Sequence, residues 1–184
     1  MRTFGVMVLG MTVGAAAIAL GVYAYFATGQ APVATAEPPM PFEKALAKKA
    51  LHARIGREMT KTVPLQPDEP NLTAGATLYR EHCAACHGLP GQKETAMAKG
   101  MYPHPPKLLE GKGVTDDEPG ESYWKVANGI RLTGMPGFRS ALSETQMWQT
   151  SLLVANADKL PKLVHDTLTS PLAAEDGAKA APTK

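Results

Sequence analysis

The stretch Cys83-Ala84-Ala85-Cys86-His87 decides how the rest of the chain is interpreted. Two cysteines three residues apart, with a histidine directly after the second, is the spacing that attaches a c-type haem. The thiols form thioether bonds and the imidazole of His87 becomes the proximal iron ligand. A zinc site would need two more Cys or His ligands at short spacing, and the chain has only these 2 cysteines. A thioredoxin-like Cys-x-x-Cys pair would belong to an α/β pattern, which the flanking sequence does not show. The motif therefore predicts one covalent haem c.

Two stretches of the chain together resemble the bacterial class I monohaem cytochromes c. The first is residues 78–88, around the haem motif, and the second is residues 128–138, which run Asn-Gly-Ile-Arg-Leu-Thr-Gly-Met-Pro-Gly-Phe. The resemblance covers about residues 71–161, roughly half of the chain. It implies an all-α fold in which three to four short helices wrap the haem, and attachment of the haem outside the cytoplasm. We expect this haem domain to occupy residues 71–165.

The sixth iron ligand has several candidates in the haem domain, namely Met97, Met101, Met135, Met147, His82 and His104. Met147 is expected to fill the core of a carboxy-terminal helix, a common use of methionine. Met135 lies between Gly134 and Pro136, where glycine allows a close approach of the backbone and proline stiffens it. It is also the position at which the resembled family carries its distal methionine. We favour Met135 over His104, because Met/His ligation is the cytochrome c pattern.

The resemblance also implies partners for the haem and its ligand. A proline-rich loop in the family lends a backbone carbonyl to the proximal imidazole, so Pro105 or Pro106 is expected to accept the Nδ1–H of His87. Arg131 and Trp124 are candidates to contact the haem propionates. The alternative is that Trp124 belongs to the core and Arg131 to the surface.

The helices of the haem domain can be placed from local signals. In the resembled family the first helix crosses the last, so we expect Gly75 and Tyr79 to meet Trp148 and Leu152. Residues 143–157 should form the last helix, because Ser143 and Gln146 have the spacing of a capping box. Residues 121–128 should form a short helix that Gly129 closes.

Residues 4–27 contain no charged side chain. As a helix they would span about 36 Å, enough to cross a hydrocarbon core of about 30 Å. A cleaved signal peptide is the alternative, since residues 34–36 are Ala-Thr-Ala, but the apolar run exceeds the usual length in such peptides. We expect a retained anchor at residues 1–28 in the bacterial inner membrane, with the amino terminus in the cytoplasm and the haem domain in the periplasm.

Residues 29–70 are interpreted as a linker. Prolines predict extended chain at residues 30–41 and a semi-rigid spacer at residues 62–70. Between them, residues 42–61 are expected to form a basic amphipathic helix, with Lys44, Lys48, Lys49, Arg54, Arg57 and Lys61. This helix could lie against anionic lipid or a partner subunit, or pack on its own haem domain, and these alternatives stay open. The composition of residues 166–184 predicts a flexible tail.

These features predict an electron carrier. Filling both axial positions with His87 and Met135 leaves no open site for a substrate, so no catalytic residue is assigned and the chain is not expected to be an enzyme. Its partners would be redox proteins, as donors and acceptors, and it would be a carrier or a subunit of a respiratory or photosynthetic complex. The net charge of +2 gives no indication of nucleic acid. The alternatives are a peroxidase-like haem enzyme or gas sensor with a labile Met135, and a scaffold role.

Overall fold

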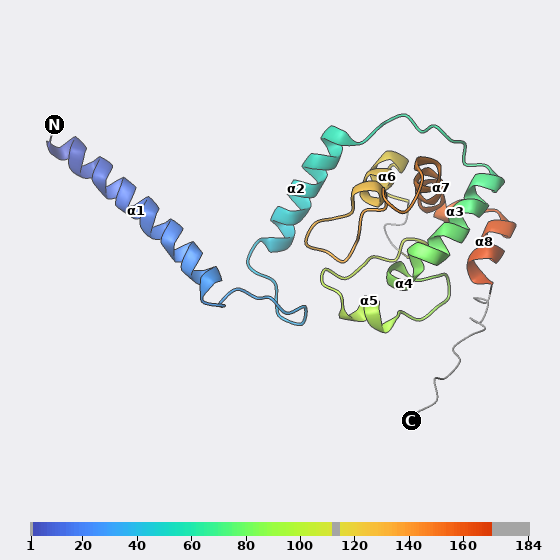
Figure 1. The fold of residues 1–184 in the computed structure, drawn as a ribbon, viewed down its shortest axis with the longest axis horizontal. Coiled ribbons are helices and arrows are strands. Elements are labelled where there is room, and N and C mark those ends of the chain that lie inside the picture. Colours follow the sequence, from blue (N-terminus) through green and yellow to red (C-terminus); the bar gives the residue numbers. More distant parts are fainter. Residues whose placement is uncertain (1, 112–114, 171–184) are drawn as a thin grey trace, which may run out of the picture. The chain divides into compact units, whose positions relative to one another are not determined.

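The structure is a computed structural model that describes residues 2–111 and 115–170. Every regular element within these residues is a helix, and no strand occurs among them (Figure 1). The all-α expectation is therefore confirmed. The chain divides into two compact units, residues 1–48 and residues 49–184.

The first unit holds helix α1 (Arg2–Ala27), which has no buried residue. It is the one helix of the described residues that is long and apolar enough to cross a membrane, with a mean hydropathy of 2.1. A folded turn follows the helix, in which the backbone amides of Val33 and Ala34 donate to the Glu37 carboxylate at 2.7 and 2.8 Å. The transmembrane helix predicted from the sequence is thus present as a regular element.

Helix α2 (Glu43–Glu58) begins in the first unit and ends in the second. Its final turns belong to the second unit and pack there, with Ile55 2% exposed. The Trp124 indole N–H donates to Glu58 Oε2 at 3.1 Å. The backbone carbonyl of Thr60 lies against Gly120, in the space that a Cβ there would take. Of the open alternatives, packing of this end of the helix on its own haem domain is what the structure shows, while Arg54 and Arg57 stay exposed.

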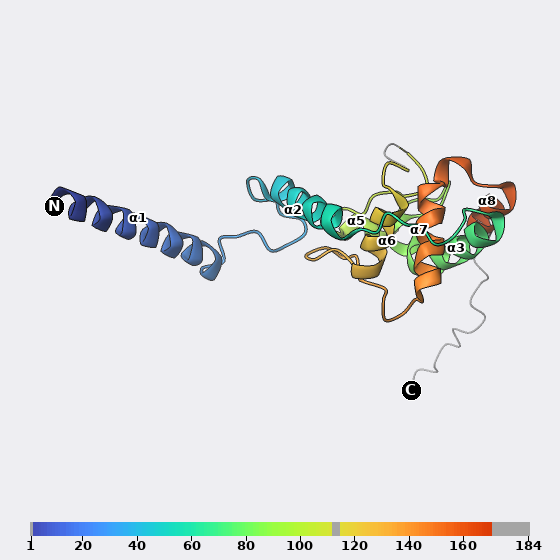
Figure 2. The same cartoon turned by 90° about the horizontal axis from the view of Figure 1, so that it is seen from above.

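The second unit is built on the crossing of α3 (Glu69–His82) with α7 (Glu144–Ala155), which is visible in Figures 1 and 2. The Asp68 side chain caps α3 by accepting from Asn71 N at 3.0 Å. Ser143 and Gln146 form the predicted capping box of α7. At the crossing, Gly75 lies against the backbone of Gln149, with its Cβ position 3.3 Å from Leu153 Cβ. The predicted crossing is present, but Gly75 meets residues one position beyond Trp148 and Leu152.

Apolar side chains pack on both sides of α3. One cluster joins Tyr79 to Leu152 and Leu153, and the other joins Leu78 to Trp148 and Tyr123. The Tyr123 and Trp148 rings stack at 4.2 Å between centroids. Helix α6 (Pro119–Asn128), which begins two residues before the predicted start, packs on α7 and supplies Tyr123.

The proline-rich stretch before α3 is more than a spacer. Val63 and Leu65 pack against both apolar clusters. The sequence predicted a semi-rigid spacer at residues 62–70, and the structure adds that its apolar residues pack on the domain. Apolar side chains between the prolines hold this stretch on the domain, because their burial removes apolar area from water.

Helix α8 (Lys162–Thr169) closes the described part of the chain beside α3. Val164 and Leu168 are fully buried, and the Arg80 guanidinium donates to the Thr167 carbonyl. The predicted start of the tail at residue 166 is therefore wrong, since residues 166–169 belong to a packed helix. Residues 171–184 of the predicted tail lie outside the described residues.

Candidate haem site

The two cysteines and the histidine occupy a single helical turn at the end of α3. Helix α4 (Ala84–His87) follows α3 through Cys83, whose N–H donates to Tyr79 O at 2.9 Å. His87 N donates to Cys83 O at 2.9 Å, which closes the turn. Cys83 and Cys86 are both free thiols, and residues three apart on a helix project from neighbouring positions of its surface. Burial, and then the neighbouring Cys86, raise the pKa of the Cys83 thiol to about 12.

The His87 imidazole is held by the proline-rich loop. Its Nδ1 lies 2.7 Å from the carbonyl oxygen of Pro106, and of the two proline candidates this is the one that makes the bond. Burial lowers the pKa of His87, while the bond to Pro106 acts in the opposite direction. A neutral imidazole that donates its Nδ1–H in this way keeps the Nε2 lone pair available for a metal.

Side-chain bonds tie the segments around His87 together. His104 Nε2 lies 2.6 Å from Glu94 Oε1, which links the proline-rich loop to the chain before α5 (Ala96–Gly100). The adjacent Thr95 hydroxyl donates to Ala85 O, inside the haem motif, at 2.7 Å. The Tyr79 hydroxyl donates to Gly88 O at 3.0 Å. The proximal side is thus fixed by bonds on several elements. In this structure His104 is engaged with Glu94.

Met135 lies in a tight turn that folds back on the end of α6. Ile130 N donates to Met135 O at 3.2 Å. The Thr133 hydroxyl donates to Ile130 O at 2.7 Å and accepts from Met135 N at 3.1 Å. We call residues 129–138 the methionine turn.

Two glycines let the methionine turn approach α6. Gly129 has φ of 68°, and a Cβ there would lie 2.8 Å from Met135 O. A Cβ on Gly137 would lie 2.8 Å from the backbone carbon of Asn128. Beyond these contacts, Phe138 N donates to Val126 O at 2.9 Å. The turn therefore needs glycine at positions 129 and 137 for its closure.

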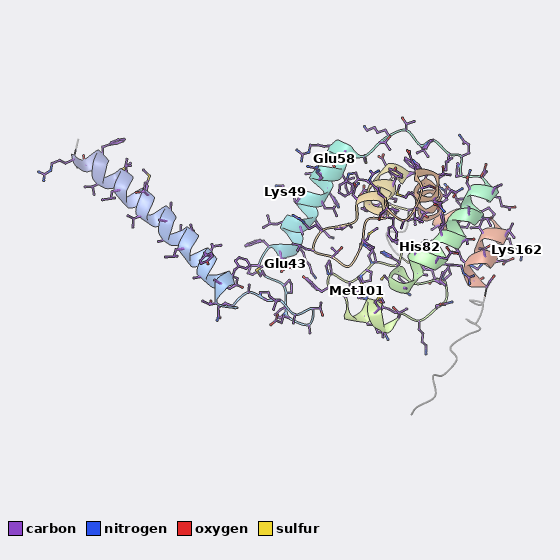
Figure 3. All side chains as sticks on the ribbon, in the orientation of Figure 1. Glu43, Lys49, Glu58, His82, Met101 and Lys162 are labelled. Atoms are coloured by element: carbon purple, nitrogen blue, oxygen red, sulfur yellow. The ribbon has the colours of Figure 1, made fainter. Side chains whose placement is uncertain are left out.

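The proline-rich segment and the end of α3 both reach the methionine turn. The methyl group of Met101 lies against Gly134, and the His82 ring is 6.0 Å from the Phe138 ring between centroids. Met101 and His82 are labelled in Figure 3. The structure thus gathers the segments that carry His87 and Met135, and Met135 itself is half-buried.

The remaining thioethers are placed differently. Met147 is 3% exposed and belongs to a core cluster, as expected. Met97 is 60% exposed, and its sulfur lies 3.6 Å from Cys86 Sγ. Among the described residues no group of three or more His, Cys, Asp and Glu side chains could hold a metal ion.

The two propionate candidates lie in different settings. The Trp124 indole N–H donates to Glu58, a residue of α2 that precedes the haem domain in the sequence. Arg131 is exposed on the methionine turn. Their contact with propionates stays a prediction. Sequence reasoning missed Thr133 as the residue that closes the methionine turn, although its place two residues before Met135 was a signal, because a threonine hydroxyl often bonds nearby backbone.

This donor set fits a haem. The chain presents paired thiols on one turn, a neutral imidazole fixed through Nδ1, and a thioether on a closed turn. Together with the all-α fold and the amino-terminal helix that is long and apolar enough to cross a membrane, it has the features of a membrane-anchored c-type cytochrome, a class of protein that serves electron transport. Residues 70–151 match the family described as cytochrome c oxidase, cbb3-type, subunit III.

Known proteins show the same likeness. The chain is 28% identical over 102 residues to the cbb3-type cytochrome c oxidase subunit FixP of Sinorhizobium medicae, a match that covers 51% of this chain and 32% of that protein. The chain thus spans about a third of the length of this curated relative. A chain of the reducing HAO-like protein complex of Kuenenia stuttgartiensis is 27% identical, with a TM-score of 0.45 over 51% of this chain and 46% of that one.

Proposed function

We propose that this chain transfers single electrons as a membrane-anchored monohaem cytochrome c, with His87 and Met135 as axial ligands and the haem bound covalently through Cys83 and Cys86. The observation that carries the proposal is the 2.7 Å contact between His87 Nδ1 and the carbonyl oxygen of Pro106. It fixes the ring as a donor through Nε2 and strengthens that donor. The chain's only 2 cysteines limit it to one haem bound through two thioethers.

The haem supplies reversible one-electron chemistry, and this chain's residues set the conditions for it. A thioether opposite an imidazole raises the reduction potential relative to two imidazoles. The bonds of Thr133 close the turn that holds the Met135 sulfur in place. With His87 and Met135 both bound to the iron, the protein would favour electron transfer over binding of a substrate. The chain is then a carrier component and not itself an enzyme.

The relatives suggest where such a carrier works. The FixP relative is by name a subunit of a cbb3-type cytochrome c oxidase. By analogy, we place this chain in a respiratory membrane complex with redox-protein partners. Helix α1 would anchor it in the inner membrane, with the haem domain in the periplasm, where c-type haem is attached. The exposed basic side chains of α2 would face anionic lipid headgroups.

Optical spectra of the full chain in mild detergent test the ligation. The ferric protein should show the iron–methionine charge-transfer band, and the ferrous protein should not bind carbon monoxide. Met135→Ala should abolish the band and admit carbon monoxide, whereas Met97→Ala should keep the wild-type spectrum. A wild-type protein without the band that binds carbon monoxide at once would instead be a haem enzyme or a gas sensor.

Purification from the native membrane tests the assignment to a complex. A subunit should co-purify with other haem proteins in a fixed ratio after mild detergent extraction. Recovery of the chain alone, with the spectrum of Met135 ligation, would identify a freely diffusing carrier.

A further inference from the structure

Gly134 differs from the other two glycines of the methionine turn. Gly129 has a positive φ, and Gly137 is hemmed in by backbone atoms of Ala127 and Asn128. Gly134 has no positive φ, so its backbone conformation is open to any residue. Among the described residues outside its chain neighbours, the heavy atoms within 4 Å of its Cβ position are the methyl carbon and the sulfur of Met101, the latter at 3.6 Å. The space beside Gly134 is therefore taken by one side chain.

Met101 connects the two sides of the haem site. It follows α5, with its N–H donating to Ala98 O at 3.3 Å. Five residues further along, Pro106 accepts the bond from His87. The side chain of Met101 is half-buried, and its methyl group reaches Gly134, the residue just before Met135.

The contact lies on a part of the methionine turn that has little other support. Among the described residues, backbone bonds join the turn to α6 at its two ends, from Gly129 N to Lys125 O at 2.8 Å and from Phe138 N to Val126 O at 2.9 Å. Between these ends, Thr133 and Ile130 bond only within the turn. At its tip, Leu132 is 93% exposed. Packing by Met101 therefore limits the outward movement of the residues that carry the ligand, since a void beside them would remove those contacts.

We propose that Met101 is a positioning residue for the Met135 ligand, acting by the packing of its terminal methyl group on Gly134 and not through its sulfur. This inference rests on the proposed ligation by Met135. Met101 keeps the turn closed and so lowers the fraction of time in which the sixth position is open.

The test compares two replacements of Met101 in the full chain. Met101→Ala removes the packed atoms, whereas Met101→Leu restores most of the volume without a sulfur. The readouts are the ferric iron–methionine band and the rate at which the ferrous protein binds carbon monoxide. Met101→Ala should keep the band at reduced intensity and bind carbon monoxide about fivefold to tenfold faster than the wild type, the effect of losing the packing of a half-buried methionine. Met101→Leu should stay within about twofold of the wild type.

Two further variants keep the test decisive. Met59→Ala removes a half-buried methionine elsewhere in the same unit and should leave both readouts unchanged. Gly134→Ala with Met101→Ala places a methyl group in the vacated space, and it should bind carbon monoxide more slowly than Met101→Ala alone. Because the added methyl group of Gly134→Ala refills part of the space that Met101→Ala empties, the double variant separates loss of packing from loss of the methionine itself.

Each contrary result has a separate meaning. Wild-type rates in Met101→Ala would overturn the positioning role. Loss of the band in both Met101→Ala and Met101→Leu would show that the Met101 sulfur is itself the ligand. A wild-type protein without the band, or a Met135→Ala protein that keeps it, would instead overturn the proposed ligation.

Discussion

The backbone carbonyl of Gln149 on α7 lies against the Cα of Gly75 on α3, in the space that a Cβ at position 75 would occupy. Each helix is capped at its start by a side chain, Asp68 on α3 and Ser143 on α7. Neither backbone can yield without shifting a helix. The closest approach of the haem domain's principal helices thus depends on the absence of one methyl group.

Gly75→Ala should destabilise the protein by about 2–3 kcal/mol, because overpacking against a backbone forces the helices apart. Thermal unfolding of the haem-loaded protein measures the effect. Gly56→Ala is the matched control, since Gly56 lies in α2 with nothing within 4 Å of its Cβ position. Alanine is the better helix former, so the control should gain up to about 1 kcal/mol. Equal effects at both positions would show that the crossing is not tight.

Lys125→Met should cost about 1–2 kcal/mol of unfolding free energy, because it leaves carboxylates without their partner. The Lys125 side chain is 20% exposed, with Nζ 2.5 Å from Asp117 Oδ2 and 2.9 Å from Glu121 Oε1. Lys162→Met is the control. That lysine is 89% exposed and pairs with Asp166, so its loss should change stability by less than about 0.5 kcal/mol. Urea unfolding distinguishes the two, and similar losses would contradict the prediction.

The same lysine predicts a dependence on alkaline pH. Burial lowers the pKa of Lys125, but the hydrogen bonds to Asp117 and Glu121 outweigh it, so its pKa is raised. A raised pKa in the folded state gives stability that is fully present below the unfolded value of about 10.4 and is lost as pH rises through the folded value. The wild type should therefore lose more stability than Lys125→Met above about pH 10.4. Parallel pH profiles for both proteins would rule this out.

Thr133→Val should loosen the methionine turn, because it removes the hydroxyl that bonds both Ile130 O and Met135 N. Two lost side-chain hydrogen bonds correspond to about 1–3 kcal/mol. We expect a weaker iron–methionine band and a lower temperature at which the band disappears on heating. Thr133→Ser keeps the hydroxyl and should behave as the wild type. An unchanged band in the valine variant would mean that glycine packing alone closes the turn.

Gly120→Ala should release the chain segment that joins α2 to the haem domain. Its methyl group would collide with the Thr60 carbonyl. Trypsin should then cleave after Arg57 or Lys61 several-fold faster, since cleavage follows local opening. Gly100→Ala serves as control because nothing lies within 4 Å of its Cβ position. Equal cleavage rates in the two variants would show that Gly120 does not hold this segment.

Local sequence signals predicted the parts of the fold that depend on neighbouring residues. The capping box of Ser143 and the closure of α6 by Gly129 are encoded within a few positions. Helix α8 was missed because its short pattern, Val164 and Leu168, adjoins a stretch with the composition of disorder. The two residues become recognisable as a buried helix face only in the folded chain, where they pack against α3.

The candidate site divides in the same way. Spacing predicted Cys83, Cys86 and His87 as the haem-binding residues, and the resemblance to the cytochromes c limited the expected acceptor of the His87 bond to Pro105 or Pro106. The contact of Met101 with Gly134 joins residues far apart in the sequence. Such a contact depends on the tertiary fold, and no local motif or periodic pattern in the sequence predicts it. The hydrogen bond from Trp124 to Glu58 also joins residues far apart in the sequence and could not be predicted from local patterns.

The packing of Ile55, Glu58 and Thr60 within the second unit also shortens the chain that connects the membrane helix to the haem domain. If residues 28–68 were fully extended, the chain between α1 and α3 could reach about 140 Å at roughly 3.4 Å per residue. With the end of α2 packed on the haem domain, the chain between the two helices is residues 28–42, which could extend about 50 Å at most by the same rise. The hydrogen-bonded turn at Glu37 shortens that reach. A partner anchored in the same membrane would then meet the haem at a high effective concentration, and the rate of electron delivery would depend on this reach more than on diffusion.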